Sequence, residues 1–498
     1  MKSHSILILL VAWLLTAGPT SVSAEDSRDN QNKSRVIQVP RDHKQIQQAI
    51  NAAGNGDTVL VSPGVYREQL RLAGKQITLA SRFLVSRDKK DIQRTVLDAS
   101  ISRDGKIISG NTPITVAADT RSGTRIVGFT IRNGGDGIIC FAKIEISHNH
   151  FINNGDAIDY ESGGGICRAN TFEKNRDDAV DLDGASEAVI EDNLILNSRD
   201  DGIEIRLHRY SGKMLNIVIR RNRIIGSGED GIQIIDYPDM SSRTIRIEHN
   251  VIARTKMAAI GCMANGNTGE NYEAASIPER IEVINNTLVD NHYGITGGDS
   301  LLAFNNVITG TEKIALKQVD GKSVLAFNLL WNNTVDNQGS HLVKKSTIKK
   351  NPRLDGNHRL LRNSPCIDAG TSLYRQGDAV LLKIPRASFS GKAPDLGAFE
   401  LARTVSPLRS RHSTRQIQTT PLWRHPSLGG HREITRVHTG ASCACGVRHG
   451  RMQRDDERTS QIFGGAIPAR TPAEDDAVVR LGWTAFEQIS AEIDSLLE

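Results

Sequence analysis

An internal repeat constrains the fold of this 498-residue chain more than any other feature of its sequence. The pattern Asn-x-apolar recurs along the chain, most often every 20 to 23 residues, at Asn149, Asn170, Asn193, Asn222, Asn250, Asn286, Asn306 and Asn328. Short β-branched segments separated by Asn, Asp and Gly turns at such a period are typical of a solenoid with one coil per repeat. The sequence therefore predicts an all-β fold, a parallel β-helix over residues 36–400.

The repeat also predicts which residues stack on one another. Consecutive coils of such a solenoid lie about 4.8 Å apart, so each repeat position becomes a column along the axis. We expect the Asn column to form an internal amide ladder that satisfies backbone groups of the turns. Residues beyond the basic period are expected to leave the coil as loops, the longest over 208–215 and 264–278. Loops often mark the working side of a solenoid.

The N-terminal residues have a different character. Residues 1–24 resemble a Sec signal peptide with Lys2, an apolar segment over Ile6–Leu15, and a small-x-small cleavage site ending at Ala24. This predicts a secreted or periplasmic protein. Residues 25–35 are a polar linker, and Ile46–Gly54 is expected to form a short amphipathic helix that caps the first coil.

The composition changes again after the repeats. No lysine follows Lys392. We expect residues 401–470 to be an Arg-rich segment of low order, and residues 471–498, which open with a capping box at Thr471, to form an amphipathic helix.

Overall composition narrows the class of protein. The net charge of +5 is small for this length and does not favour nucleic acid binding. After the N-terminus no apolar segment approaches the length of about 18 residues that a membrane span needs. We therefore expect a monomer with neither a nucleic acid partner nor a membrane span.

Acidic residues form two of the predicted columns. The turn column contains Asp136, Asp156, Asp178, Asp201 and Asp230, each followed by Gly or Ala and then Ile or Val. Strand alternation then points Asp159, Asp181 and Glu204 outward from neighbouring coils. An Asp in a turn has an ordinary structural explanation, whereas stacked acids within strands are disfavoured and point to function.

Three central coils are thus expected to expose a wall of carboxylates. Two unit charges about 5 Å apart repel by roughly 3 kcal/mol at an effective dielectric constant of 20. A bound cation or retained protons would relieve this repulsion. Oxygen ligands at this density favour Ca²⁺, with sodium or an empty site as the alternatives.

Both ends of the repeat region resemble a known superfamily. Ile46-Gln-x-Ala-Ile with Gly56-Asp-Thr-Val, and Asp395-Leu-Gly-Ala-Phe-Glu, are similar to the opening and closing segments of pectate-lyase-like right-handed β-helix proteins. The resemblance implies a right-handed helix. It does not fix the function, because the superfamily holds lyases, hydrolases, epimerases and adhesins.

A shorter motif resembles one calcium-dependent family of β-helix pectate lyases. Asp177-Asp-Ala-Val-Asp181-Leu is similar to its Asp-Asp-Gly-Phe-Asp-Leu motif, although Ala and Val replace Gly and Phe. The resemblance implies that Asp177, Asp178, Asp181 and Asp156 hold Ca²⁺. Asp201 and Glu204 join them as candidate ligands through their places in the acidic columns. We find no unambiguous counterpart of the family's lysine base.

These features predict a calcium-assisted polyuronide lyase that acts on acidic polysaccharide by β-elimination. That reaction removes the proton next to a carboxylate, so the carboxylate charge must first be neutralised and a base must then take the proton. The candidate bases are Arg206, which points outward beside the acidic wall, and Lys213, in the predicted loop that follows. Arg209 and His208 lie in that same loop and are candidate substrate-binding residues.

Two other functions fit the same acidic wall. A glycoside hydrolase could use paired Asp residues on successive coils as acid and base. The chain lacks the Gly-His-Gly and Arg-Ile-Lys sequences that we associate with polygalacturonases. A non-catalytic carbohydrate-binding or cell-surface β-helix would need the acids but no base.

Overall fold

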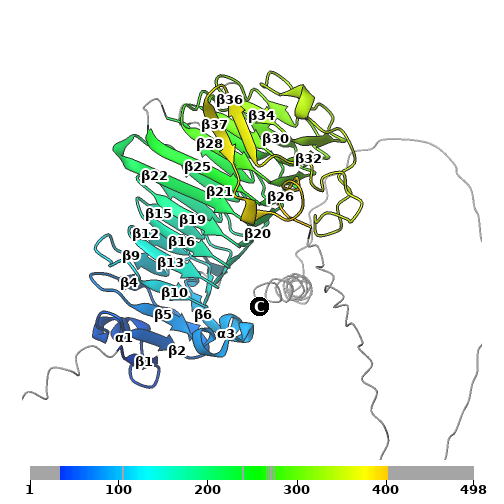
Figure 1. Ribbon diagram of the computed structural model, residues 1–498. Coiled ribbons are helices and arrows are strands. Elements are labelled where there is room, and N and C mark those ends of the chain that lie inside the picture. The colour runs from blue at the N-terminus through cyan, green and yellow to red at the C-terminus, as the bar shows by residue number, and fades with distance from the viewer. Residues whose placement is uncertain are drawn as a thin grey trace, which may run out of the picture. The chain divides into compact units, whose positions relative to one another are not determined.

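The computed structural model describes residues 34–103, 106–237, 241–264, 266, 269, 272 and 275–401. They form the predicted right-handed parallel β-helix, in which each coil contributes one strand to each of three long sheets (Figure 1). The predicted signal peptide, nearly all of the linker, and the tail from residue 402 lie outside the described residues.

Sheet 1 has twelve strands. They are β1 (Val36–Val39), β2 (Thr58–Val61), β5 (Thr78–Ser81), β10 (Arg125–Val127), β13 (Lys143–Ser147), β16 (Gly164–Arg168), β19 (Glu187–Glu191), β22 (Tyr210–Arg220), β25 (Ser241–Glu248), β28 (Arg280–Ile284), β31 (Leu301–Phe304) and β34 (Val324–Ala326). Sheet 2 has eleven strands. They are β3 (Gly64–Tyr66), β6 (Thr95–Asp98), β11 (Thr130–Arg132), β14 (His150–Ile152), β17 (Thr171–Glu173), β20 (Leu194–Leu196), β23 (Arg223–Ile225), β26 (Val251–Ala253), β29 (Thr287–Val289), β32 (Val307–Thr309) and β35 (Leu329–Trp331).

Sheet 3 has ten strands and carries the acidic columns. Its strands are β4 (Leu70–Leu72), β9 (Ile114–Val116), β12 (Ile138–Cys140), β15 (Ile158–Glu161), β18 (Val180–Asp183), β21 (Ile203–Arg206), β24 (Ile232–Ile235), β27 (Ala258–Met263), β30 (Tyr293–Thr296) and β33 (Leu316–Lys317). The inward residues of these strands are fully buried, as the column Ile158, Val180, Ile203 and Ile232 illustrates. Stacked β-branched side chains therefore fill the interior of the solenoid.

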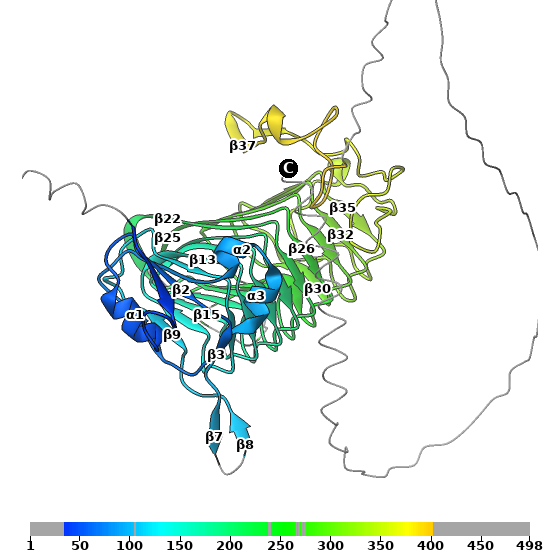
Figure 2. The same cartoon turned by 90° about the horizontal axis from the view of Figure 1, so that it is seen from below.

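The N-terminal end is capped as predicted. Helix α1 (Ile46–Ala52) buries Ile46, Ala49 and Ile50 against the first coil. Figure 2 shows α1 at this end, together with the short helices α2 (Phe83–Ser86) and α3 (Lys89–Arg94). A hairpin of β7 (Ile101–Arg103) and β8 (Lys106–Ile108) projects from the same region.

The predicted Asn column is a continuous amide ladder. The backbone N–H of each Asn donates to the side-chain oxygen of the Asn on the next coil, from Asn149 to Asn328, over 2.8 to 3.0 Å. Each side-chain NH₂ donates to a backbone carbonyl as well, for example from Asn193 to Cys167 over 2.9 Å. Every amide is therefore both donor and acceptor in the scaffold.

One predicted loop was wrong. Residues 208–215 were expected to leave the coil, but β22 begins at Tyr210 and pairs with β25, with a register shift between Tyr210 and Leu215. The extra residues lengthen both strands together, so their backbone groups are paired within sheet 1. Of the other predicted loop, over 264–278, seven positions between 265 and 274 lie outside the described residues.

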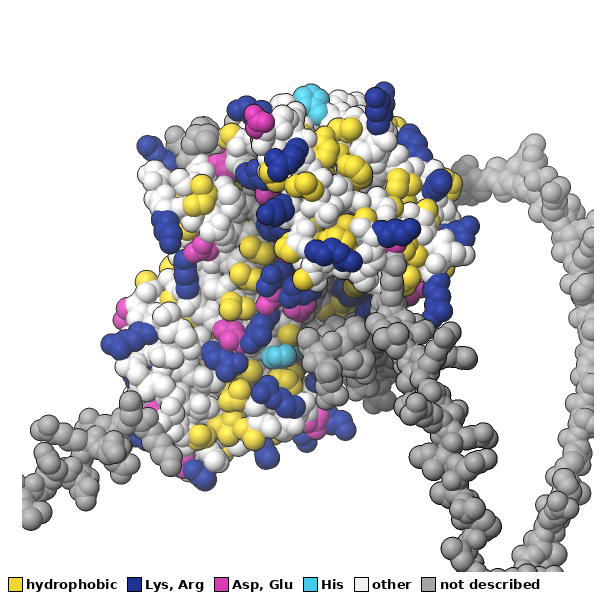
Figure 3. Space-filling view, viewed as in Figure 1, with side chains coloured by type: hydrophobic (Ala, Val, Ile, Leu, Met, Phe, Trp, Pro, Cys, Tyr) yellow, Lys and Arg dark blue, Asp and Glu magenta, His cyan; other side chains and the backbone are white. Residues whose placement is uncertain are grey.

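The middle coils of sheet 1 carry paired charges on their outer face. Lys and Arg side chains spread over this face with acidic side chains between them (Figure 3). Glu145 accepts from Arg125 and Arg168, and Arg246 donates to Glu248 and Glu282. Opposite charges alternate from coil to coil here, which is the stabilising arrangement for a solvated sheet.

The closing segment does not continue the coils. After β35 and the short helix η1 (Lys344–Ser346), residues 349–401 add no strand to the three sheets. Strands β36 (Leu373–Gln376) and β37 (Ala379–Lys383) form a separate hairpin, which is followed by helix η2 (Arg386–Ser388). Leu354, Ala398 and Phe399 pack on the outward side of sheet 2 against Ile225 and Val289.

Candidate functional site

An acidic pocket lies where the turns after sheet 2 lead into sheet 3. Its volume is about 360 Å³, and it is lined by Asp156, Asp177, Asp178, Asp181, Asp200, Asp201, Glu204, Arg206, Glu229 and Gly269. All six acids that the sequence predicted as metal ligands line this pocket, together with Arg206. Strands β18 and β21 supply its wall, and the turns before them supply its rim.

The strand register places the acids as the alternation predicted. Asp159 pairs with Asp181 between β15 and β18, and Asp181 pairs with Glu204 between β18 and β21. The column ends at Gln233 in β24, where an amide follows the acids. Because paired residues on adjacent strands project to the same side, these carboxylates are forced together.

The turn column forms a second ladder, made of carboxylates. The backbone N–H of Asp178 donates to Asp156 Oδ1 over 3.0 Å, that of Asp201 to Asp178 Oδ1 over 2.7 Å, and that of Asp230 to Asp201 Oδ1 over 2.6 Å. One oxygen of each carboxylate thus has the structural role of a turn residue.

The carboxylates are more buried than the sequence suggested. We expected an exposed wall, but Asp178, Asp181, Asp201 and Glu204 keep only 2 to 5% of their surface accessible. The turns and the neighbouring coils shield them, so they lie at the base of a pocket and not on an open face. Asp177 remains exposed at its rim.

Two triplets of acids have the spacing of a metal site. Ligand oxygens of Asp156, Asp177 and Asp178 lie within 4.8 Å of one another, and so do those of Asp178, Asp181 and Glu204. Asp178 belongs to both triplets. Within the described part of the chain, Asp181 Oδ1 is buried and has no hydrogen-bond partner.

Crowding of the acids raises their pKa values. Burial, and then the charge of Asp177, raise the pKa of Asp156 to about 8. Burial, and then the charges of Glu204 and Asp183, raise the pKa of Asp181 to about 9. The pKa of Asp178 is also raised, by burial and then by Glu204. At neutral pH some of these carboxyl groups therefore stay protonated, which lowers the negative charge of the pocket.

Arg206 is the one basic residue among those that line the pocket. It donates to Glu204 and lies 3.6 Å from Asp183. Burial alone would lower the pKa of Arg206, but the hydrogen bond and charge of Glu204, with the charges of Asp181 and Asp183, outweigh it and raise this pKa. Its guanidinium is therefore held in the charged form.

The other predicted catalytic and substrate-binding residues do not line the pocket. Lys213 is an exposed residue of β22, away from the loop position that the sequence suggested. Arg209 is exposed as well. His208 accepts from the backbone N–H of Gly184 at Nδ1 over 3.1 Å, and its ring lies 4.5 Å from that of Tyr237. This bond fixes the Nε2–H tautomer of a neutral His208.

Two lining acids were not among the predicted ligands. Asp200 and Glu229 each stand one residue before the turn column, on the two coils that follow Asp177, which holds the same position. The signal was the repeated acid pair, Asp177-Asp178, Asp200-Asp201 and Glu229-Asp230. It marks a third column that a single motif does not reveal.

A known protein family has the same architecture over part of the chain. The sequence pattern of the family "Right handed beta helix region" matches residues 106–212. Among solved structures, pectate lyase Pel9A is similar over 74% of this chain and 96% of its own, with 16% identity and a TM-score of 0.46. A GH87 α-1,3-glucanase from Streptomyces thermodiastaticus matches over 61% of this chain and 64% of its own, with 15% identity and a TM-score of 0.36.

A surface adhesin is similar too. PfbA, a surface adhesin of Streptococcus pneumoniae, matches over 57% of this chain and 80% of its own, with 13% identity and a TM-score of 0.35. A search of the curated proteins finds no match. At these identities no residue role carries over to this chain. Within the described residues, no helix has the length and apolar character of a membrane span.

Proposed function

We propose that the acidic pocket binds Ca²⁺ and that the protein is a calcium-assisted lyase of acidic polysaccharide. One observation carries the proposal: Asp178, Asp181 and Glu204 are buried together, and Asp181 Oδ1 has no hydrogen-bond partner among the described residues. A buried polar atom without a partner is costly, and a cation at this point would supply one.

The donor chemistry fits calcium. The side chains that line the pocket offer carboxylate oxygens and one guanidinium, with no His or Cys among them. Hard oxygen donors in this number suit Ca²⁺, which accepts six to eight of them with flexible geometry, whereas zinc sites use nitrogen or sulfur. Asp156, Asp177, Asp178, Asp181, Asp201 and Glu204 are the proposed ligands.

A calcium ion bound here would neutralise a substrate carboxylate and so acidify the proton on the neighbouring carbon. Arg206 would bind the same class of substrate, because a guanidinium pairs well with a carboxylate. A solenoid also offers a long surface parallel to its axis along which a polymer can lie. The substrate we propose is therefore an acidic polysaccharide. The predicted signal peptide would place the enzyme outside the cytoplasm.

Arg206 and Lys213 remain the two proposed bases, on different grounds. Arg206 borders the pocket, and the charges of Glu204 and Asp181 raise its pKa. Neutralisation of those two carboxylates would remove that effect and bring Arg206 closer to release of its proton. Lys213 is exposed and would have to reach the substrate from outside the pocket. Lys213→Ala distinguishes the two: loss of turnover in this variant identifies Lys213 as the base. Full turnover in Lys213→Ala, with turnover lost in Arg206→Ala and polymer binding retained, identifies Arg206.

A polysaccharide assay tests the function. Purified protein is incubated with pectate and with alginate, with calcium or with EDTA, and the ultraviolet absorbance of the unsaturated product is followed. We expect a calcium-dependent rise that Asp181→Asn abolishes. Glu312→Gln, which removes an exposed acid on a different turn, should retain full activity.

Three results would contradict the proposal. New reducing ends without unsaturated product would indicate a hydrolase. Full activity in EDTA would exclude the calcium requirement. Binding of the polymer without any turnover would indicate a carbohydrate-binding protein.

A further inference from the structure

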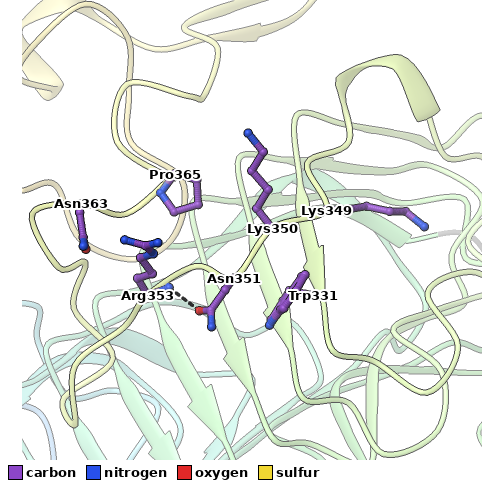
Figure 4. Close-up of a pocket in the computed structure, with 7 residues that line it drawn as sticks. All are labelled: Trp331, Lys349, Lys350, Asn351, Arg353, Asn363 and Pro365. Carbon is purple, nitrogen blue, oxygen red and sulfur yellow. Dashed lines mark hydrogen bonds between the residues drawn. The ribbon is translucent and has the colours of Figure 1, made fainter.

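A second pocket of about 360 Å³ lies near the end of the solenoid and has the opposite charge. It is lined by Trp331, Lys349, Lys350, Asn351, Arg353, Asn363 and Pro365. In Figure 4, Asn363 lies to the left of Arg353, Pro365 lies above it, and Asn351 and Trp331 lie to its right. We call this the basic pocket. None of its lining residues is acidic, and none belongs to the acidic pocket.

Two cations of the basic pocket are available to a ligand. Lys349 is paired with Asp336 over 2.8 Å. Lys350 and Arg353 are exposed, and neither side chain makes an ion pair with another described residue. On the outer face of sheet 1, by contrast, several Arg residues are matched by acids. Other exposed cations without an ion pair occur on the described surface, for example Arg121, Lys322 and Lys345. The basic pocket is distinguished by the gathering of three basic side chains and no acidic side chain around one hollow.

Trp331 supplies an apolar surface next to these cations. It ends the outward column of sheet 2 that runs through Leu196, Ile225, Val289 and Thr309. The closing segment packs over the earlier apolar members of that column, but Trp331 keeps 38% of its surface accessible. An exposed aromatic face beside hydrogen-bond donors is a frequent element of ligand sites.

We propose that the basic pocket binds an acidic oligosaccharide. The indole face would pack against a sugar ring, Lys350 and Arg353 would bind its carboxylate or sulfate group, and the amides of Asn351 and Asn363 would contact hydroxyl groups. The choice of a sugar over another anion rests on the proposed function. Two free cations are too few for the extended basic stripe that tracks a nucleic acid backbone.

The register fixes the spacing of the two pockets along the axis. Trp331 is five coils from Leu196 in the same column, and Asp200 and Asp201 lie in the turn that follows Leu196. Five coils span about 24 Å along the solenoid. The basic pocket would thus hold a distant part of the polymer whose reacting part lies at the acidic pocket, and the linkage of two contacts would raise the affinity for long chains.

The test measures binding in EDTA, so that neither calcium nor turnover contributes. An oligogalacturonate of about ten residues is titrated into the full-length protein by calorimetry, with a neutral galactan of similar length as the comparison ligand. We expect saturable binding of the oligogalacturonate alone, which weakens as salt is added. The double variant Lys350→Glu/Arg353→Glu should weaken binding at least tenfold, and Trp331→Ala should weaken it as well.

A matched control removes the effect of net charge. Lys344→Glu/Lys345→Glu changes the charge equally on the neighbouring helix η1, outside the pocket, and should leave the affinity unchanged. Equal weakening by both double variants would overturn the proposal, as would equal binding of the neutral galactan. Tighter binding of single-stranded DNA than of oligogalacturonate would also overturn it. If the native protein shows no lyase activity but still binds oligogalacturonate in EDTA at the basic pocket, only the proposed function is contradicted.

Discussion

The amide ladder and the carboxylate ladder are two columns of one solenoid that differ by one donor group per coil. Both repeat at the coil spacing, and in both a side-chain oxygen accepts the backbone N–H of a neighbouring coil. Each Asn also donates its NH₂ to a carbonyl, so its polar atoms are used within the scaffold. An ionised Asp has no such donor, and its second oxygen is left for another partner.

This difference separates scaffold from site. The amide ladder is neutral and carries no electrostatic penalty, so it can run from Asn149 to Asn328 without interruption. In the carboxylate ladder, burial and neighbouring acids raise the pKa values of Asp156 and Asp178, and they do the same for Asp181 in the adjacent strand column. A buried column of acids is stable only if it keeps protons or binds cations. We attribute function to this ladder together with the strand column of Asp181 and Glu204 for this reason.

The largest effect is expected when a carboxylate is placed in the amide ladder. In Asn193→Asp, the side chain loses the donor that serves the Cys167 carbonyl and brings a buried charge toward Asn222 Oδ1. We expect the free energy of unfolding to fall by about 3–5 kcal/mol at neutral pH, the usual effect of an uncompensated buried charge. Urea unfolding at neutral pH measures the loss.

The same variant should recover part of its stability in acid. Its buried Asp has a raised pKa, so the penalty is absent below the ordinary Asp pKa and grows as the pH rises. The matched control is Asn197→Asp, at an exposed position directly after β20 on the same coil, and it should change the stability little. An equal loss at both positions would contradict the distinction between the ladder and its surroundings.

A smaller effect is expected when Asp181, which lies beside the carboxylate ladder, is replaced by a neutral amide. Calcium at a hundred times its dissociation constant should stabilise the native protein by about 2.7 kcal/mol. Asp181→Asn should lose most of this gain, because its amide cannot act as an anionic ligand, yet it should be at least as stable as the native protein in EDTA. Thermal unfolding with calcium and with EDTA measures both. An undiminished calcium effect in the variant would remove Asp181 from the site.

The pH dependence of stability in EDTA should follow the raised pKa values. The folded-state pKa values of Asp156 and Asp181 are about 8 and about 9, well above those of the unfolded chain. Their contribution to stability is therefore full below about pH 4 and is lost as the pH rises toward 9. Calcium should flatten this decline, since the ion replaces the protons. A stability in EDTA that rises from pH 5 to 9 would contradict the crowding of these acids.

The smallest effect is expected at the edge of the acidic column. Asp159 pairs with Asp181 on one side and with the apolar Ile139 on the other, and it does not line the pocket. Burial, and then Glu161, raise its pKa to about 7. Asp159→Asn should change the free energy of unfolding by less than about 1 kcal/mol and leave the calcium effect intact. Loss of the calcium effect in this variant would extend the site by one coil.

Much of this arrangement follows from the repeat itself. A period near 22 fixes the register, and the register fixes which of Asp159, Asp181 and Glu204 stand side by side. Burial depth could not be predicted, because it depends on how the turns and neighbouring coils close over the columns. The use of Asp178 Oδ1 as a backbone acceptor was also hidden, since it requires the local turn geometry.

Regions outside the repeat were the least predictable. The extension of β22 depends on pairing with β25, a contact between segments that a single-strand pattern does not contain. This extension separates Lys213 from the pocket. The basic pocket joins Trp331 of the last coil to residues 349–365 of the closing segment, whose position on sheet 2 no periodicity encodes.

Direct titration of calcium tests the central claim most simply. Calorimetry on the metal-free protein should show saturable calcium binding that tightens with rising pH and releases protons, because the ion displaces those held by the crowded acids. Asp181→Asn should lose most of this affinity, while Asn197→Asp should not affect it. The absence of saturable binding to the native protein, or equal binding by Asp181→Asn, would contradict the account.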